Sequence, residues 1–386
     1  MMAMQRNGDV REKDENEYGD GVAWVRGPML GEGSFGRVYK ATLRNSSTSR
    51  YSCLPSEMAV KSAEVSVSGT LQKEKEIMNN LYGSPYVIQC FHEETTSGDN
   101  GVMAYNLLLE YGSGGTLADR IKKSGGNGLP EHEVRMHTRS ILRGLNHIHG
   151  TGYVHCDLKP ENILLVPNIF ADKYRAKIGD FGSAKREMNR INTKKRKLME
   201  QYCCWRGTPM YLSPKAVTDS VQDDVGIESD APCLYAEAYR KSIGCIVLEM
   251  ITGKAPWEGK KEDILQKIGS GKELPKIPNE IISVEARDFL KHCFVRKSMF
   301  RFTCGMLLNH PFVQGLEDDV DEELSSDSFS CSSSKEEYAH DDGGSISGLE
   351  EENESNKEIM STQLVSSQCF SERRHHPVSF TIPAGI

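Results

Sequence analysis

Eight consecutive residues near the middle of the chain carry its most specific chemistry. They read His155-Cys156-Asp157-Leu158-Lys159-Pro160-Glu161-Asn162. A carboxylate at Asp157 can accept a proton from a hydroxyl group, an ammonium at Lys159 can neutralise a phosphoryl group in transfer, and an amide oxygen at Asn162 can bind Mg²⁺. These residue types, on a loop after a long helix, predict phosphoryl transfer with Asp157 as the base.

A second acidic site follows in the tripeptide Asp180-Phe181-Gly182, at the end of an expected strand. Asp180 can bridge Mg²⁺ to the β- and γ-phosphates of a nucleotide. The tripeptide is common by itself, so its value lies in its position after the first stretch.

A glycine-rich segment near the N-terminus has the pattern G-x-G-x-x-G-x-V. It consists of Gly31, Glu32, Gly33, Ser34, Phe35, Gly36, Arg37 and Val38. A plain glycine turn and a dinucleotide-binding fold share this pattern. Residues 37–43 favour a strand where the dinucleotide fold needs a helix, and no Walker sequence occurs. The glycines would let backbone N–H groups approach a phosphate.

Lys61 ends the next expected strand, in Met58-Ala59-Val60-Lys61. Such a lysine is often only solvated, but next to a glycine-rich loop it predicts the cation that binds α- and β-phosphates. An acidic partner must fix its position. Glu74 on the following helix is the best candidate, Glu76 is the second choice, and Glu64 is too close in sequence.

The elements that must position these residues divide into two parts, because the first part is rich in strands and the second in helices. We expect strands at 35–43, 57–63 and 106–110, and helices at 71–81, 131–149, 243–252, 261–269, 284–294 and 303–309. The junction falls near residues 110–112. The pattern therefore predicts two lobes with the chemical residues between them.

Charge divides the 386 residues into unlike segments. The net charge of −8 is the sum of −3 over residues 1–23, +8 over 24–315 and −13 over 316–386. The last segment has 15 serines and no apolar periodicity, and so it cannot bury enough surface to fold. We expect a disordered arm at 1–23, a folded domain at 24–315 (lobes 24–111 and 112–315), and a disordered acidic, serine-rich tail at 316–386.

Several classes of protein are disfavoured by composition. The longest apolar run, 243–251, is far shorter than the roughly 20 residues of a membrane span. The N-terminus lacks the apolar core of a signal peptide. Eleven cysteines without regular spacing favour reduced intracellular thiols over disulfides or zinc. We expect no membrane insertion and no nucleic-acid partner. The expected location is cytoplasmic, and also nuclear if residues 194–197, Lys-Lys-Arg-Lys, are an import signal and not a solvated loop run.

Over about residues 24–315 the sequence resembles the eukaryotic protein kinases, of the serine/threonine type. Residues 207–214 are similar to the substrate-docking segment of MAP kinase kinase kinases, and residues 253–257, 288–294 and 307–312 match the C-terminal lobe of the same group. The cysteine of His155-Cys156-Asp157 resembles the plant MEKK-like subgroup. The resemblance implies an α+β bilobal fold that binds ATP and Mg²⁺. It also implies transfer of the γ-phosphate to Ser/Thr of a MAP kinase kinase in a signalling or stress cascade.

The resemblance also assigns roles around the nucleotide. Residues 31–36 and Lys61 with Glu74 would bind phosphates, while Asn162 and Asp180 would bind Mg²⁺. Adenine would lie among Leu30, Val38, Ala59 and Leu164, with Leu109 as gatekeeper and the backbone of Glu110 and Gly112 at its edge. Thr208 would hydrogen-bond Asp157 and Lys159.

The sequence departs from the family pattern at three places, and the last two keep a pseudokinase or scaffold open as the alternative. Cys156 replaces an arginine that normally binds an activation-loop phosphate, so activity without that phosphate is expected. Lys215 replaces a glutamate that normally pairs with the arginine matched by Arg301. Tyr239 and Lys241 replace an aspartate and a tryptophan, through true divergence or an error in the gene model.

Overall fold

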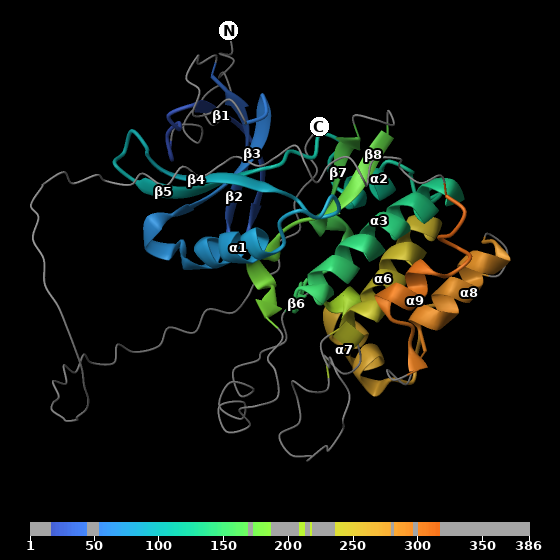
Figure 1. Ribbon diagram of the computed structural model, residues 1–386. Coiled ribbons are helices and arrows are strands. Elements are labelled where there is room, and N and C mark those ends of the chain that lie inside the picture. The colour runs from blue at the N-terminus through green and yellow to red at the C-terminus, as the bar shows by residue number, and fades with distance from the viewer. Residues whose placement is uncertain are drawn as a thin grey trace, which may run out of the picture. The chain divides into compact units, whose positions relative to one another are not determined.

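The computed structural model describes residues 17–44, 54–168, 173–186, 208–212, 217, 236–278, 282–295 and 300–316. Of residues 236–241 it describes the backbone but not the side chains. The chain divides into two units, Met1–Asp321 and Glu322–Ile386. All of the described residues belong to the first unit, whose two lobes are visible in Figure 1.

The first lobe is built on a five-stranded antiparallel sheet with the order β1-β2-β3-β5-β4. Its strands are β1 (Trp24–Gly33), β2 (Gly36–Leu43), β3 (Glu57–Glu64), β4 (Cys90–Ser97) and β5 (Met103–Leu109). The three strands expected by range are confirmed as β2, β3 and β5. The residues of β3 from Met58 to Ala63 are all buried, because the lobe covers both faces of this strand.

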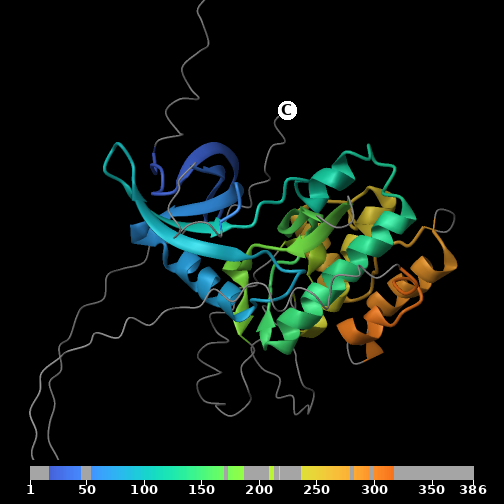
Figure 2. The ribbon, with the colours of Figure 1, turned by 45° about the horizontal axis from the view of Figure 1, so that its top comes forward.

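Helix α1 (Gly69–Asn80) contacts β4 and β5 (Figures 1 and 2). Leu71, Ile77 and Met78 are buried on the helix side that faces the sheet, as the spacing predicted. Glu74 is buried on the same helix, which already distinguishes it from an ordinary solvated carboxylate.

The second lobe is mainly helical, as expected. Its helices are α2 (Leu117–Lys122), α3 (Glu131–Gly150), α6 (Ala236–Thr252), α7 (Lys261–Ser270), α8 (Val284–Cys293) and α9 (Cys304–Leu308). Short ribbons join β6 (Tyr153–Val154) to β9 (Lys185–Arg186) and β7 (Ile163–Asn168) to β8 (Lys173–Ile178). Of these described helices, α2 alone was not expected, although Thr116 and Asp119 form a capping box that its sequence could have indicated.

Backbone hydrogen bonds join the two lobes. The Ile88 N–H donates to the Ile178 carbonyl, and the Ile178 N–H donates to the Tyr86 carbonyl, both at 2.9 Å. Gly144 of α3 permits this approach, because a Cβ there would lie 2.9 Å from the Tyr86 carbonyl oxygen. The expected α+β bilobal fold is thus confirmed, and the loops after β6 and β8 open at the junction of the lobes.

The first lobe begins earlier than the expected boundary at residue 24. Residues 17–23 are ordered against the sheet, and the Tyr18 side chain is buried against Tyr39 and Ala104. Two of the acidic residues in the expected disordered arm form ion pairs, Glu17 with Arg37 of β2 and Asp20 with Arg44 just after β2. Residues 1–16 and 317–386, which include nearly all of the expected tail, lie outside the described residues.

Among the described helices, none is both long enough and apolar enough to cross a membrane.

Candidate active site

A charged group with two buried members, which we call the cleft triad, consists of Lys61 on β3, Glu74 on α1 and Asp180 just after β8. The Lys61 ammonium lies 2.7 Å from Glu74 Oε2 and 2.8 Å from Asp180 Oδ1. The Lys61 and Glu74 side chains are 8% and 1% exposed, whereas Asp180 is 37% exposed and opens toward solvent. Glu74 is therefore the partner of Lys61, as preferred, and Glu76 is exposed on the same helix.

Burial and charge act in opposite directions on the cleft triad. Burial alone would lower the pKa of Lys61, but the carboxylates of Glu74 and Asp180 raise it above its usual value. Burial also raises the pKa of Glu74. At Asp180 the nearby ammonium overcomes burial and lowers the pKa. Near neutral pH, Lys61 is thus charged and holds an ionised Asp180. Glu74 is the carboxyl group of the triad that is harder to ionise.

Glu74 also joins α1 to the segment after β8. Its Oε1 accepts a hydrogen bond of 3.1 Å from the Phe181 N–H. Because its other oxygen contacts Lys61, one carboxylate fixes α1, β3 and the Asp180-Phe181-Gly182 turn relative to each other.

Backbone strain is concentrated at this site. Among the described non-glycine residues, Cys156 with φ 67° and Asp180 with φ 60° are the ones that have a positive φ. Such a conformation costs about 1–3 kcal/mol and persists only where the surroundings enforce it. Both strained residues lie on the two loops that sequence reasoning assigned to chemistry.

His155 fixes these loops to each other. Its fully buried ring lies 2.8 Å from the Gly179 carbonyl through Nε2 and accepts the Asp157 N–H at 3.3 Å through Nδ1. It also packs edge-on against the Phe181 ring. Burial lowers the pKa of His155, so the neutral ring with its proton on Nε2 satisfies both contacts. His155 is therefore a positioning residue beneath the catalytic loop.

The Asp157 carboxylate is held from two sides. Its Oδ1 accepts hydrogen bonds from the Thr208 N–H at 3.0 Å and the Thr208 hydroxyl at 3.1 Å. The Lys159 ammonium lies 3.2 Å from Oδ2, and the Asn162 amide donates to the Asp157 carbonyl at 2.8 Å. The structure thus brings Asp157, Lys159 and Asn162 together as expected, and it shows the predicted contact between Thr208 and Asp157.

The glycine-rich segment forms the turn between β1 and β2. Gly33 pairs with Gly36 and Glu32 pairs with Arg37, so Ser34 and Phe35 occupy the tip. A Cβ at Gly36, whose φ is 138°, would lie 2.4 Å from the Ser62 carbonyl oxygen. The pattern is therefore a strand–turn–strand hairpin, which confirms the exclusion of the dinucleotide fold.

The tip of this hairpin reaches the cleft triad. The Phe35 ring centre lies 5.9 Å from the Lys61 ammonium, and a Cβ at Gly182 would lie 2.5 Å from the Phe35 ring. Gly182 is therefore required for the close approach between the two glycine-containing segments.

The residues expected around adenine come from both lobes. Val38 of β2 pairs with Lys61, and Ala59 of β3 pairs with Leu109. Leu30 of β1 is 42% exposed, and Leu164 of β7 is partly buried against the core. The strand pairing thus places Val38 and Ala59 beside Lys61, and the role of all five residues in binding adenine stays a prediction.

Two backbone groups between the lobes are already engaged. The Glu110 N–H donates to the Gln89 carbonyl and the Gly112 carbonyl accepts the Gly115 N–H, both at 2.9 Å. The Glu110 carboxylate pairs with Lys177 at 2.6 Å. The groups at 110 and 112 that could meet an adenine edge are thus the Glu110 carbonyl and the Gly112 N–H.

Sequence reasoning missed one buried contact below the site. The Tyr211 hydroxyl donates to the Glu249 carboxylate of α6 at 2.6 Å, and the Ser242 hydroxyl donates to the Tyr211 carbonyl at 2.6 Å. Burial raises the pKa of Glu249 to about 7. These bonds anchor the segment that carries Thr208, and a glutamate within the apolar run 243–251 was the signal that could have revealed them.

Two of the three departures fall outside what the structure describes. Lys215 and the side chains of Tyr239 and Lys241 lie outside the described residues, although the backbone of 236–241 forms the start of α6. Arg301, the expected neighbour of Lys215, is 5% exposed and donates to the Val295 carbonyl at 2.9 Å. Cys156 is described, and its thiol lies 3.6 Å from the Val154 carbonyl oxygen.

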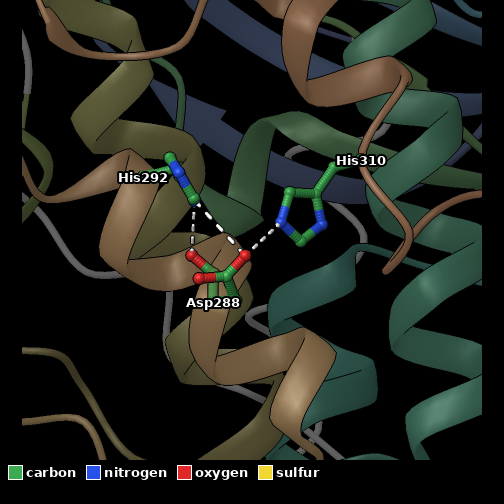
Figure 3. A group of neighbouring side chains, drawn as sticks. All are labelled: Asp288, His292 and His310. Atoms are coloured by element: carbon green, nitrogen blue, oxygen red, sulfur yellow. Dashed lines mark hydrogen bonds and ion pairs between the residues drawn. The ribbon is translucent and has the colours of Figure 1, made fainter.

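A second titratable group, which we call the C-lobe triad, consists of Asp288 and His292 on α8 and His310 after α9 (Figure 3). Potential ligand atoms of these three residues lie within 4.8 Å of one another. However, His310 Nδ1 accepts the Phe312 N–H at 3.1 Å, which leaves the proton on Nε2 facing Asp288 at 3.1 Å. His292 Nδ1 lies 2.9 Å from the Asp288 carbonyl oxygen. Both nitrogens that face Asp288 thus act as donors, and the group does not fit a metal site.

Comparison with known proteins agrees with the fold and the cleft. A family model for the protein kinase domain matches residues 24–313. The chain is 44% identical over 303 residues to mitogen-activated protein kinase kinase kinase 20 of Arabidopsis thaliana, covering 77% of this chain and 80% of the relative. It is 37% identical over 306 residues to mitogen-activated protein kinase kinase kinase 18 of the same plant, covering 77% and 79%.

The fold, the catalytic loop and the cleft triad define the class, which is that of the ATP-dependent phosphotransferases with two lobes. The chain belongs to the protein kinase family, and it is a serine/threonine protein kinase.

Proposed function

We propose that this kinase acts as a MAP kinase kinase kinase, transferring the γ-phosphate of ATP to Ser/Thr residues of a MAP kinase kinase in a signalling or stress cascade. The observation that carries the proposal is the assembled catalytic loop, in which Thr208 and Lys159 hold the Asp157 carboxylate from opposite sides. The names of the relatives support the choice of substrate class.

ATP and Mg²⁺ fit the residues present. Oxygen ligands suit Mg²⁺, and the carboxylate of Asp180 and the amide of Asn162 supply them. Lys61 holds Asp180 Oδ1, while the side chain stays partly open to solvent. Mg²⁺ would neutralise the β- and γ-phosphates during transfer.

The side chains of the protein would then position the reacting groups and neutralise the charge of the phosphates. Lys61, held by Glu74, would bind the α- and β-phosphates, and the glycine-rich hairpin would cover them with backbone N–H groups. Asp157 Oδ2 lies beside the Lys159 ammonium, whereas Oδ1 is taken by Thr208. We therefore assign Oδ2 as the acceptor of the substrate hydroxyl proton, with Lys159 neutralising the phosphoryl group next to it.

A pseudokinase or scaffold is the competing proposal, motivated by Lys215, Tyr239 and Lys241, which lie outside the described residues. The described contacts favour the enzyme, because Lys61 is held by Glu74 and Asp157 is held by Thr208, as expected of a working kinase. For location we propose the cytoplasm, with entry to the nucleus through residues 194–197 as an addition.

The test is transfer of labelled phosphate from ATP to a MAP kinase kinase whose own active site is inactivated, with a generic Ser/Thr protein as a second acceptor. We expect wild type to label the MAP kinase kinase preferentially and Lys61→Met to label neither. ATP binding without any transfer by wild type would instead establish the scaffold, and equal labelling of both acceptors would overturn the substrate class.

A further inference from the structure

Residues 17–23, which we call the N-terminal strap, are fastened to the sheet of the first lobe. The Tyr18 carbonyl accepts the Thr96 hydroxyl at 2.5 Å, and the Val22 N–H donates to the Glu94 carboxylate at 2.8 Å. The strap therefore joins the start of β1 to the outer strand β4.

The middle of the strap is buried among aromatic and cationic side chains. Tyr18 is 7% exposed and meets the Tyr39 ring edge-on at 6.3 Å. Arg26, 6% exposed, donates to the Gly19 carbonyl at 2.9 Å and to Ser62 at 2.8 Å. Cation–π contacts of Arg26 with both tyrosine rings complete the packing. The strap is thus a fixed part of the lobe.

The first residue of the strap contacts the glycine-rich hairpin. Arg37 stands opposite Glu32 across the hairpin, and its Nε donates to Glu32 at 3.0 Å. Its Nη1 donates to the carboxylate of Glu17. Because Arg37 lies between Gly36 and Val38, a single guanidinium ties the strap to both strands that carry the phosphate-covering turn.

Two glycines allow the strap to approach the turn after β4. A Cβ at Gly98 would lie 1.9 Å from the Glu17 carbonyl oxygen. A Cβ at Gly19, whose φ is 67°, would lie 2.2 Å from the Ser97 carbonyl oxygen. A side chain at Gly98 would therefore displace Glu17 without touching the hairpin itself.

We propose that Glu17 is a positioning residue that, through Arg37, holds the glycine-rich hairpin over the phosphates of bound ATP. The kinetic part of this inference rests on the proposed function, but the binding part does not. Glu17 and Arg37 are 28% and 30% exposed, so solvent weakens the pair. We expect loss of the pair to weaken ATP binding by about three- to fivefold.

The experiment measures binding of two ligands to the full chain by calorimetry. A non-hydrolysable ATP analogue with Mg²⁺ reports contacts to base and phosphates, and adenosine reports contacts to the base alone. The variants are Glu17→Gln, which removes the charge, and Gly98→Ala, which displaces the strap. Glu57→Gln is the matched control. Glu57 pairs with Lys40, which lies on β2 as Arg37 does but away from the tip of the hairpin.

We expect Glu17→Gln and Gly98→Ala to bind the ATP analogue about three- to fivefold more weakly and adenosine as wild type does, with Glu57→Gln unchanged. In steady-state assays the KM for ATP should rise and kcat should change less. Wild-type affinity of Glu17→Gln for the analogue would overturn the proposal. An equal loss for adenosine would also overturn it, because that result indicates a general structural role. A wild type that binds ATP but transfers no phosphate contradicts the proposed function alone.

Discussion

Two groups of three titratable side chains, the cleft triad and the C-lobe triad, differ in their cations and in their surroundings. In the cleft triad the cation is Lys61, whose ammonium contacts the side chains of Glu74 and Asp180, and Glu74 also accepts the Phe181 N–H. In the C-lobe triad the two basic groups are histidines that contact backbone groups, the Phe312 N–H and the Asp288 carbonyl. A lysine held by side chains can exchange partners when a ligand arrives, whereas a histidine bound to backbone keeps a segment in place.

The energetic consequences differ in the same way. A buried ion pair gains little over apolar packing, because dehydrating its charges costs about as much as their attraction returns. The cleft triad adds a strained backbone at Asp180 to this cost. Such an arrangement is expected where charge serves a ligand, and the C-lobe triad shows neither feature.

The largest effect should come from breaking the cleft triad with Lys61→Met. We expect activity to fall at least about 100-fold, because a charge that stabilises the transferring phosphates is lost. Phosphate transfer measured under conditions where circular dichroism shows a folded chain checks this. Lys122→Met, on the exposed side of α2, is the control and should keep full activity. A variant with Lys61 removed and more than a tenth of wild-type activity would show that the cleft triad is structural.

A carboxylate whose bonding partner is neutral should respond to pH more than either triad. Glu249 bonds to the Tyr211 phenol, and burial raises its pKa from 4.5 to about 7. Protonated Glu249 contributes to the free energy of unfolding. This contribution is fully present below pH 4.5 and is lost as the pH rises through about 7. At about 1.4 kcal/mol per pH unit, this loss is bounded by about 3.5 kcal/mol.

Urea unfolding of wild type and Glu249→Gln at pH 5, 6, 7 and 8 measures this difference. We expect the glutamine variant to lose less stability than wild type between pH 5 and 8. Glu133→Gln is the control, because the hydrogen bond with His137 and the contact with Arg120 lower the pKa of Glu133, which then stays ionised across this range. Parallel curves for wild type and Glu249→Gln would contradict the raised pKa.

Breaking the C-lobe triad with His310→Ala should affect stability and not catalysis. The change leaves the Phe312 N–H without its buried acceptor, which costs about 1–3 kcal/mol. Chemical unfolding measures the loss, and transfer per folded molecule should equal that of wild type. If a folded His310→Ala variant loses phosphate transfer, the C-lobe triad has a role in catalysis, and the proposed difference between the two triads is wrong.

Sequence reasoning succeeded where chemistry depends on local spacing. Asp157, Lys159 and Asn162 lie within six residues, and Glu74 could be chosen because its helix face was readable from Leu71 to Leu81. Glu74 contacts Lys61 as predicted.

It failed where a residue's role depends on a distant partner. Glu17 and Asp20 counted toward a disordered arm because the local sequence does not show their partners. These partners, Arg37 and Arg44, lie 20 and 24 positions away. Glu249 was hidden because Tyr211 is 38 positions away. Acidic composition alone does not tell a solvated carboxylate from one that has a cation or a phenol across the fold.

The smallest effect should come from Asp288→Asn. Asp288 is 54% exposed, so solvent screens its charge, and the amide can still accept from His310 Nε2. We expect a loss of less than about 1 kcal/mol in urea unfolding. Because one imidazole proton faces the Asp288 carboxylate and the other faces the Asp288 carbonyl, Zn²⁺ at micromolar concentration should leave the melting temperature of wild type and variant equally unchanged. If Zn²⁺ raises the melting temperature of wild type and not of Asp288→Asn, the C-lobe triad binds metal, and bonding to backbone does not by itself mark a structural group.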